Sequence, residues 1–429
     1  MNPTCRLNLA SVFATLLGLL ASNVASAQLN LRFEVEKPPF EYSETEPNNR
    51  VSRLIAKLKS KELKLEYTRE RGYLDSLLDA LEIPQSSQTL VFSKTSMQVR
   101  HISPRNPRAV YFNDDTYLGW IRGSSLMEIS TVDPKLGAAF YTVDMMPWRA
   151  KIEQATYDCL ACHLTSMTQG VPGHTVRSVL PSFDGSVASQ LESFITNHRS
   201  PFSQRWGGWY VTGHHGEMTH LGNPFLRGGQ LDTDNNGNRT HLRDKFDTHD
   251  YLLPYSDIVA LVVLEHQSQT HNAMTRADFS VRQLRHERSQ AEATEESEDE
   301  WRAQLHLIAK PLVEAMLFCD ETELTSEVKG SIEFAHEFES RGPHDEQGRS
   351  LRQFDLKTRM FKYPLSYLIY SDAFDSLSEE LRGEVIRQLR DVLEERDTSE
   401  TYAHLTTDMR RDILEILRAT KPGFERDAS

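Results

Sequence analysis

The sequence predicts a mainly α-helical protein with a smaller α+β lobe near its N-terminus. Between residues 276 and 421, apolar residues recur at helical spacing, most clearly in "SLSEELRGEVIRQLRDVLEE" (376–395). In that segment Ser376 and Glu379 have the spacing of a capping box. Between residues 88 and 144, short runs rich in Val, Tyr and Phe alternate with turn residues instead, which is typical of antiparallel strands. The chain has 429 residues, enough for two or three domains.

The predicted α+β lobe spans residues 28–148. It opens with two segments, "RVSRLIAKLKSKEL" (50–63) and "YLDSLLDALEI" (73–83), in which Leu and Ile follow a helical period. Strands are expected next in "TLVFSKT", "AVYFN", "TYLGWI", "LMEISTV" and "AAFYTVD", because Pro, Asn-Asp and Gly-Ser separate these runs. A helical region is expected over residues 276–429, and "SDIVALVVLEHQ" (256–267) just before it is interpreted as a buried helix.

Residues 1–27 are predicted to be a secretory signal peptide. Arg6 is followed by the apolar run "LASVFATLLGLLA" and then by "ASA" before Gln28. The apolar run is short for a membrane crossing, which takes roughly 20 residues, so a retained membrane anchor is the less favoured alternative. We therefore expect a periplasmic or otherwise exported protein with no transmembrane segment after signal cleavage.

The net charge and the small number of cysteines disfavour several classes of protein. A formal net charge of −14 makes binding to nucleic acid or to an anionic membrane a poor expectation. Of four cysteines, Cys5 belongs to the predicted signal peptide, and three cysteines are too few to act as a disulfide scaffold in a chain of this size. Cys319 follows the apolar run "VEAMLF" and is expected to be a buried small side chain.

The stretch "YDCLACHLTS" (157–166) contains the residues that are most informative about function. Cys159 and Cys162 are separated by two residues, and His163 follows directly. The preceding residues contain no Pro or Gly, so a helix is expected to run into the motif and to place all three side chains on one face. Two thiols and an adjacent imidazole suit a haem, because the thiols add to its two vinyl groups and the imidazole ligates its iron. The motif thus predicts one covalent haem c, with His163 as proximal iron ligand, in a haem-binding region over residues 149–275.

Two other uses of the motif are weighed against haem. A structural zinc site needs four ligands, commonly from a second Cys or His pair, and the sequence has no second CxxC. A thioredoxin-like dithiol lies between a strand and the start of a helix, with a lowered thiol pKa. Both stay open as alternatives, and covalent haem is favoured over them.

Beyond this motif, the chain resembles a largely uncharacterised family of exported bacterial proteins described as containing a cytochrome c domain. The resemblance covers most of the mature chain and rests on these stretches: "LVFSKTSMQ", "PRAVYFNDDTYLGW", "CLACH", "HRSPFSQRWGGWYVTG", "SDIVALVVLEHQ", "RGPHDEQGRSLRQFDL", "YPLSYLIYSDAFD" and "ILRATKP". It implies a single c-type haem, and no reaction or substrate. With the motif, it leads us to expect a cytochrome c-like haem region embedded in a larger chain.

A second iron ligand is sought in the Gly-rich segment "RWGGWYVTGHHGEMTHLGNP" (205–224), because glycines let the backbone approach a flat porphyrin. Ten of the sixteen histidines fall between residues 149 and 275. The distal candidates are His214, His215, Met218 and His220, with Met97, His101, His249, His266 and His271 as less favoured ones. Arg199 and Arg205 are candidates for pairing with the haem propionates, since Arg binds carboxylates in a bidentate manner.

A possible second metal site lies at "DTDNNGNRTH" (232–241). Asp232, Asp234, Asn236 and Gly237 match the start of a calcium-binding loop. Arg243, however, occupies the position at which a bidentate Glu is required. A surface turn rich in Asp and Asn is the favoured interpretation, and calcium binding is left open.

The predicted function is that of an exported mono-haem c-type cytochrome that binds haem and transfers electrons to a redox partner protein. A haem enzyme of peroxidase or oxidase type, with an open or displaceable distal site, is the alternative. The length of the chain favours this alternative, since a simple carrier needs far fewer residues around its haem. A haem-based sensor or binding module is the third hypothesis. The sequence contains no Gly-x-Ser-x-Gly, HExxH or phosphate-binding motif.

Overall fold

The computed structural model describes residues 33–148, 150–231, 237–290 and 298–425. About 36% of the protein is helical and about 17% lies in strands, which include a large antiparallel sheet of seven strands. The expected mainly α fold with a cytochrome c-like haem region is therefore wrong. The N-terminal and central parts of the chain are built on this sheet, and long helices dominate only from residue 258 onward.

The large sheet has the strand order β6-β5-β4-β3-β2-β1-β9. Its strands are β1 (Thr89–Val91), β2 (Arg108–Phe112), β3 (Thr116–Trp120), β4 (Leu126–Asp133), β5 (Gly137–Asp144), β6 (Lys151–Gln154) and β9 (Trp209–Tyr210). Strands β1 to β5 confirm the five expected from the sequence. The two edge strands come from the segment expected to surround a haem, and β9 pairs with β1 through Leu90 and Tyr210.

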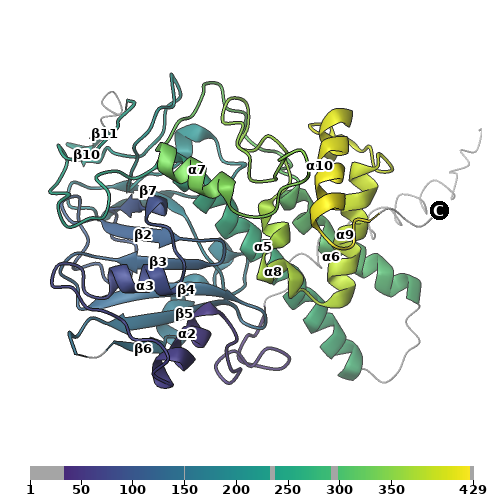
Figure 1. The fold of residues 1–429 in the computed structure, drawn as a ribbon, viewed down its shortest axis with the longest axis horizontal. Coiled ribbons are helices and arrows are strands. Elements are labelled where there is room, and N and C mark those ends of the chain that lie inside the picture. The colour runs from purple at the N-terminus through teal and green to yellow at the C-terminus, as the bar shows by residue number, and fades with distance from the viewer. Residues whose placement is uncertain (1–32, 149, 232–236, 291–297, 426–429) are drawn as a thin grey trace, which may run out of the picture.

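Helices cover one face of the sheet at the N-terminus. Helix α2 (Arg50–Lys59) and helix α3 (Leu74–Ala80) occupy the two segments expected to be helical. The side chain of Asn49 caps α2 by accepting a hydrogen bond from the Ser52 amide. The buried face of α3 shares a hydrophobic core with β2 and β3, and Figure 1 shows α3 lying against the sheet.

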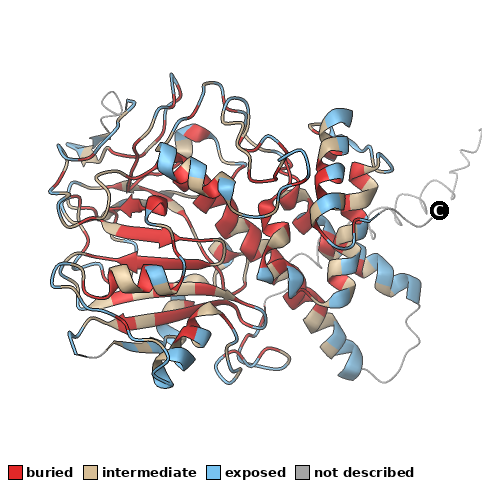
Figure 2. Cartoon of the chain, viewed as in Figure 1, coloured by how far each residue is buried: buried red, intermediate tan, exposed pale blue. Residues whose placement is uncertain are grey.

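The C-terminal part is helical, as expected. Its helices are α5 (Ile258–Gln290), α6 (Glu298–Met316), α7 (Ile332–Ser340), α8 (Asp372–Asp375), α9 (Glu379–Leu393) and α10 (Thr407–Thr420). The 33-residue helix α5 runs between the sheet and the other helices, and Figure 2 shows how deeply it is buried there. The residue that caps α9 is Ser378 and not Ser376, which instead ends α8, so the expected capping box does not form.

Smaller elements complete the described chain. They are the motif helix α4 (Tyr157–His163), the hairpin of β7 (Arg177–Pro181) and β8 (Val187–Ile195), and the short pair β10 (Leu226–Arg227) and β11 (Gln230–Leu231). Cys319 is buried, as predicted. Among the described helices, none combines the length and the apolar character that a membrane crossing requires. The predicted signal peptide and residues 232–236 of the calcium-like loop lie outside the described residues.

Candidate functional site

A cavity of about 230 Å³ lies against the second face of the large sheet and contains the cysteine motif in its wall. Side chains two residues apart on a strand point to the same face, and most of the lining residues on four neighbouring strands follow this rule. Antiparallel pairing aligns them into two rows, Val110-Gly119-Glu128-Thr142 and Tyr117-Ser130-Phe140. The remaining wall includes Asp158, Cys159, Cys162, His163, Met167, His174, Arg177, Trp209, Leu264 and Ser268.

Helix α4 brings the three motif side chains to this cavity. It is only seven residues long, and the segment before it forms strand β6 rather than the expected continuous helix. The side chain of Leu160 is buried in the N-terminal core and anchors α4 against the sheet. Cys159, Cys162 and His163 therefore line one wall together, as their spacing on a helix predicts.

Both thiols of the motif are free, and the surroundings of Cys159 weigh against a redox dithiol. Burial raises the pKa of Cys159 to about 11, with the acidic groups of Glu128 and Asp158 adding to the effect. A redox-active dithiol needs a lowered thiol pKa, so this environment does not suit one. Within the described ranges, no cluster of three or more His, Cys, Asp or Glu side chains is arranged to hold a metal ion.

The imidazole of His163 is oriented by the backbone. Its Nδ1 lies 2.9 Å from the carbonyl oxygen of Gly173 and must be the donor, because a carbonyl oxygen only accepts. Burial lowers the pKa of His163 despite this hydrogen bond, so the ring is neutral and Nε2 carries a lone pair. A neutral imidazole with one nitrogen held by a carbonyl is the usual arrangement of a metal-ligating histidine.

A second imidazole, that of His174, lines the same cavity and was not among the candidates predicted from the sequence. Only 5% of its surface is exposed, and its ring packs on Tyr117 with a centroid distance of 4.4 Å. Asn272 on α5 holds its backbone from both sides, because the His174 amide donates to Oδ1 at 2.8 Å and the carbonyl accepts from Nδ2 at 2.7 Å. Neither ring nitrogen has a hydrogen-bond partner in the described part of the protein.

Tyr117 connects the cavity to a buried polar network. Its hydroxyl accepts a hydrogen bond from Gln267 at 2.8 Å and forms a second hydrogen bond with Nδ1 of His271 at 3.1 Å. Gln267 in turn accepts from the hydroxyl of Tyr367 at 2.6 Å. The polar side chains in the middle of α5 are thus used to join the sheet to the C-terminal helices.

The predicted distal candidates lie elsewhere, since none of His214, His215, Met218 and His220 is among the lining residues. Nδ1 of His215 donates to the Met218 carbonyl at 2.5 Å, and Nδ1 of His220 accepts from the Gly222 amide at 3.0 Å. The two rings pack together at 4.7 Å. Of the Gly-rich segment, Trp209 reaches the cavity. Of the less favoured candidates, Met97 does.

The predicted propionate partners are also outside the cavity wall. Arg205 forms a buried ion pair with Glu265, with 3.2 Å between Nη1 and Oε2, and Arg199 donates from Nε to the Cys319 carbonyl at 3.0 Å. The arginines that line the cavity are Arg108, paired with Glu128 at 2.6 Å, and Arg177, whose Nε donates to Ser193 at 2.7 Å. Nothing in the sequence distinguishes these two arginines from the others.

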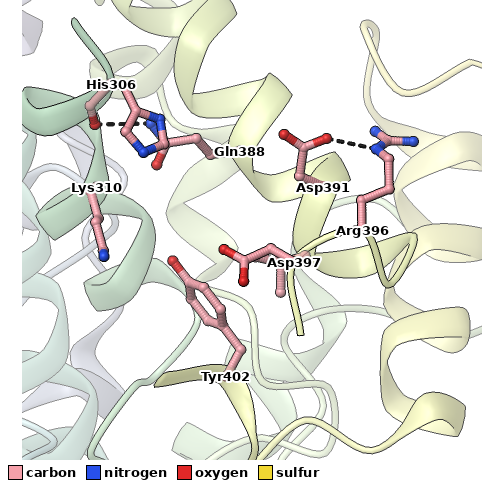
Figure 3. Close-up of a pocket in the computed structure, with 8 residues that line it drawn as sticks. His306, Lys310, Gln388, Asp391, Arg396, Asp397 and Tyr402 are labelled. Carbon is pink, nitrogen blue, oxygen red and sulfur yellow. Dashed lines mark hydrogen bonds and ion pairs between the residues drawn. The ribbon is translucent and has the colours of Figure 1, made fainter. Parts of the chain in front are cut away.

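A second cavity, of about 200 Å³, lies among the C-terminal helices (Figure 3). In its wall Arg396 pairs with Asp391 at 2.7 Å, as Figure 3 shows. His306, also in the wall, pairs at 3.1 Å with Glu384, which is not a lining residue. It holds neither a cysteine nor an unpartnered imidazole, so the described residues favour the first cavity as the functional site.

Comparisons with protein-family models, with curated proteins and with solved structures find no match for this chain. The resemblance to cytochrome c domain-containing proteins stays a prediction, and the function is inferred from the chemistry of the site.

Proposed function

We propose that the first cavity holds one c-type haem and that the protein transfers electrons. Cys159 and Cys162 would tether the haem, and His163 would ligate its iron. The observation that carries the proposal is that two free thiols and a neutral, backbone-oriented imidazole line one wall of one cavity. When bound, the haem supplies a one-electron redox centre whose potential depends on its ligands and surroundings.

The other lining residues suit a porphyrin, which is apolar on its faces and anionic at its propionates. Phe140 packs against the His163 ring with a centroid distance of 4.8 Å, and Val110, Val176 and Leu264 add apolar surface. Arg108 and Arg177 place two guanidinium groups in the wall, where they would bind carboxylates.

Exposed apolar residues beside the motif support electron exchange with a partner protein. Tyr157, the first residue of α4, is 86% exposed, and Met97 in the cavity wall is 54% exposed. Large apolar side chains of this kind are enriched at protein interfaces. A partner docked on these residues would lie beside the cysteine motif. The proposal includes export, because covalent haem attachment in bacteria is completed outside the cytoplasm.

The test is to express the full chain in bacteria together with a cytochrome c maturation system. Haem staining of a denaturing gel then reports covalent attachment. We expect the wild type and Cys319→Ala to stain, since Cys319 is buried and does not line the cavity, and Cys159→Ala/Cys162→Ala to lose the stain. A reversible one-electron redox titration of the stained protein would support electron transfer. A wild type that carries no covalent haem would overturn the proposal.

A further inference from the structure

The cavity wall contains a buried imidazole for which the described protein provides no partner. Both ring nitrogens of His174 lack a hydrogen bond, although the side chain is almost completely buried. Buried polar atoms are satisfied in the great majority of cases, and a group left unsatisfied requires an explanation. His174 lines the cavity that contains the cysteine motif. A ligand bound in that cavity could therefore contact the unpartnered ring nitrogens.

The position of His174 is fixed. Asn272 holds its amide and carbonyl, and Tyr117 packs on its ring. Gly173 leaves room for this arrangement, since a Cβ there would lie 2.3 Å from Oδ1 of Asn272. The carbonyl of the same glycine orients His163. One dipeptide, Gly173-His174, therefore determines the placement of both imidazoles.

The chemistry of His174 suits a metal ligand better than an acid-base group. Imidazole ligates metals through an unprotonated ring nitrogen, and neither ring nitrogen of His174 is used in a hydrogen bond within the described residues. The rings around it are those of Tyr117, Phe140 and His271, and no carboxylate is hydrogen-bonded to it. The two thioethers in the wall, Met97 and Met167, are less buried than His174.

We propose that His174 is the second axial ligand of the haem iron. The inference rests on the proposed function, because it requires a haem tethered at Cys159 and Cys162. It assigns the iron two imidazole ligands, His163 and His174, in place of a ligand from the Gly-rich segment. Two nitrogen ligands give a low-spin iron without a vacant position, and without the methionine that raises the potential of Met/His cytochromes.

The experiment compares optical spectra of the haem-loaded full chain as wild type, His174→Ala, Met167→Ala and His220→Ala. We expect the wild type, Met167→Ala and His220→Ala to be low-spin and unreactive toward carbon monoxide. His174→Ala should keep its covalent haem by gel staining, become high-spin and bind carbon monoxide. Added imidazole should restore the low-spin spectrum of His174→Ala, and an unchanged far-ultraviolet circular dichroism spectrum should show that this variant is folded.

The outcomes separate this inference from the proposed function. A haem-stained His174→Ala protein that stays low-spin would overturn the ligand assignment and leave haem attachment intact. A high-spin, carbon-monoxide-reactive wild type would also overturn the ligand assignment, and it would favour the alternative function as a haem enzyme. Conversion to high spin in Met167→Ala would assign the position to that thioether. A wild type without covalent haem would remove both proposals at once.

Discussion

The imidazole of His163 donates to the carbonyl oxygen of Gly173 over 2.9 Å, directly before His174 in the chain. The backbone that orients the predicted proximal ligand therefore also presents the second imidazole of the cavity. This arrangement connects the geometry of the motif to helix α5, because Asn272 holds the same backbone.

Replacing Gly173 should disturb both imidazoles. In Gly173→Ala the new Cβ would lie 2.3 Å from Oδ1 and 2.9 Å from Cγ of Asn272, so that side chain must move. We expect a loss of about 1–3 kcal/mol in the free energy of unfolding and a lower yield of haem-stained protein. Urea unfolding and the ratio of haem to protein absorbance measure the two effects.

Gly383 in α9 offers the matched control, since open space surrounds its Cβ position. Gly383→Ala should raise the free energy of unfolding by about 1 kcal/mol, because Ala is the better helix former. Equal effects of the two substitutions would contradict the role given to Gly173.

Asn272→Ala should destabilise the protein through the backbone of His174. The substitution leaves one buried amide and one buried carbonyl without partners, at about 1–3 kcal/mol for each group. Ser289→Ala on the exposed end of the same helix should change the free energy of unfolding by less than about 0.5 kcal/mol. Chemical denaturation of both variants measures these changes. An unchanged free energy of unfolding in Asn272→Ala would show that its two hydrogen bonds to the His174 backbone are dispensable.

The buried ion pair of Arg205 and Glu265 should be structural. The exposed fractions of the two side chains are 3% and 0%, so Arg205→Met leaves a buried carboxylate unpaired and should cost about 3–5 kcal/mol. The double variant Arg205→Met/Glu265→Leu should be less destabilised than this single variant. A double-mutant cycle from urea unfolding measures the coupling, and additive losses would argue against it.

Arg177 should instead act on the haem. Removing a positive charge from the cavity wall disfavours the reduced iron, so Arg177→Gln should lower the reduction potential by on the order of 40 mV, or about 1 kcal/mol for a one-electron couple. The double variant Arg205→Met/Glu265→Leu removes no net charge and should leave the potential near its wild-type value. Potentiometric titration of the two proteins distinguishes them, and equal shifts would contradict this assignment.

Buried histidines should make the protein sensitive to acid. Burial lowers the pKa of His220 to about 3, so between pH 6.5 and 3 the unfolded chain takes up a proton that the folded chain does not. The stabilisation is complete above pH 6.5 and is lost by about 1.4 kcal/mol per pH unit as the pH falls. Glu321 acts with the opposite sign, because burial raises its pKa to about 7.

Comparison with His220→Gln cancels the contribution of Glu321. The stability of the wild type relative to this variant should fall by about 1.4 kcal/mol per unit below pH 6.5. Urea unfolding at pH 7, 6 and 5 measures the difference, and a constant difference would show that His220 titrates normally.

The N-terminal strands were predictable because each is a short run bounded by turn residues. Strand β6 was not, since "KIEQ" is an exposed edge strand without the apolar alternation that marks one. Strand β9 has two residues, and its pairing partner β1 lies more than one hundred residues earlier in the chain. The expectation of a mainly α fold failed because this central segment joins the sheet.

The site was predictable where its chemistry is local. The spacing of Cys159, Cys162 and His163 on a helix could be read directly, whereas His174 depends on Asn272, 98 residues further along the chain. The distal ligands predicted in the Gly-rich segment do not line the cavity for a related reason. Its histidines are used in local hydrogen bonds and ring packing, which a search for ligand types does not reveal.

Helix α5 is needed by any shortened form of this protein that is to keep the cavity intact. It contributes Leu264 and Ser268 to the cavity wall and Asn272 beneath His174, while Phe279 packs in the N-terminal core. A chain cut before Ile258 would keep the CxxCH motif and lose this support. The motif alone would therefore lack part of the cavity wall, which explains why a haem bound as proposed would need residues from well beyond it.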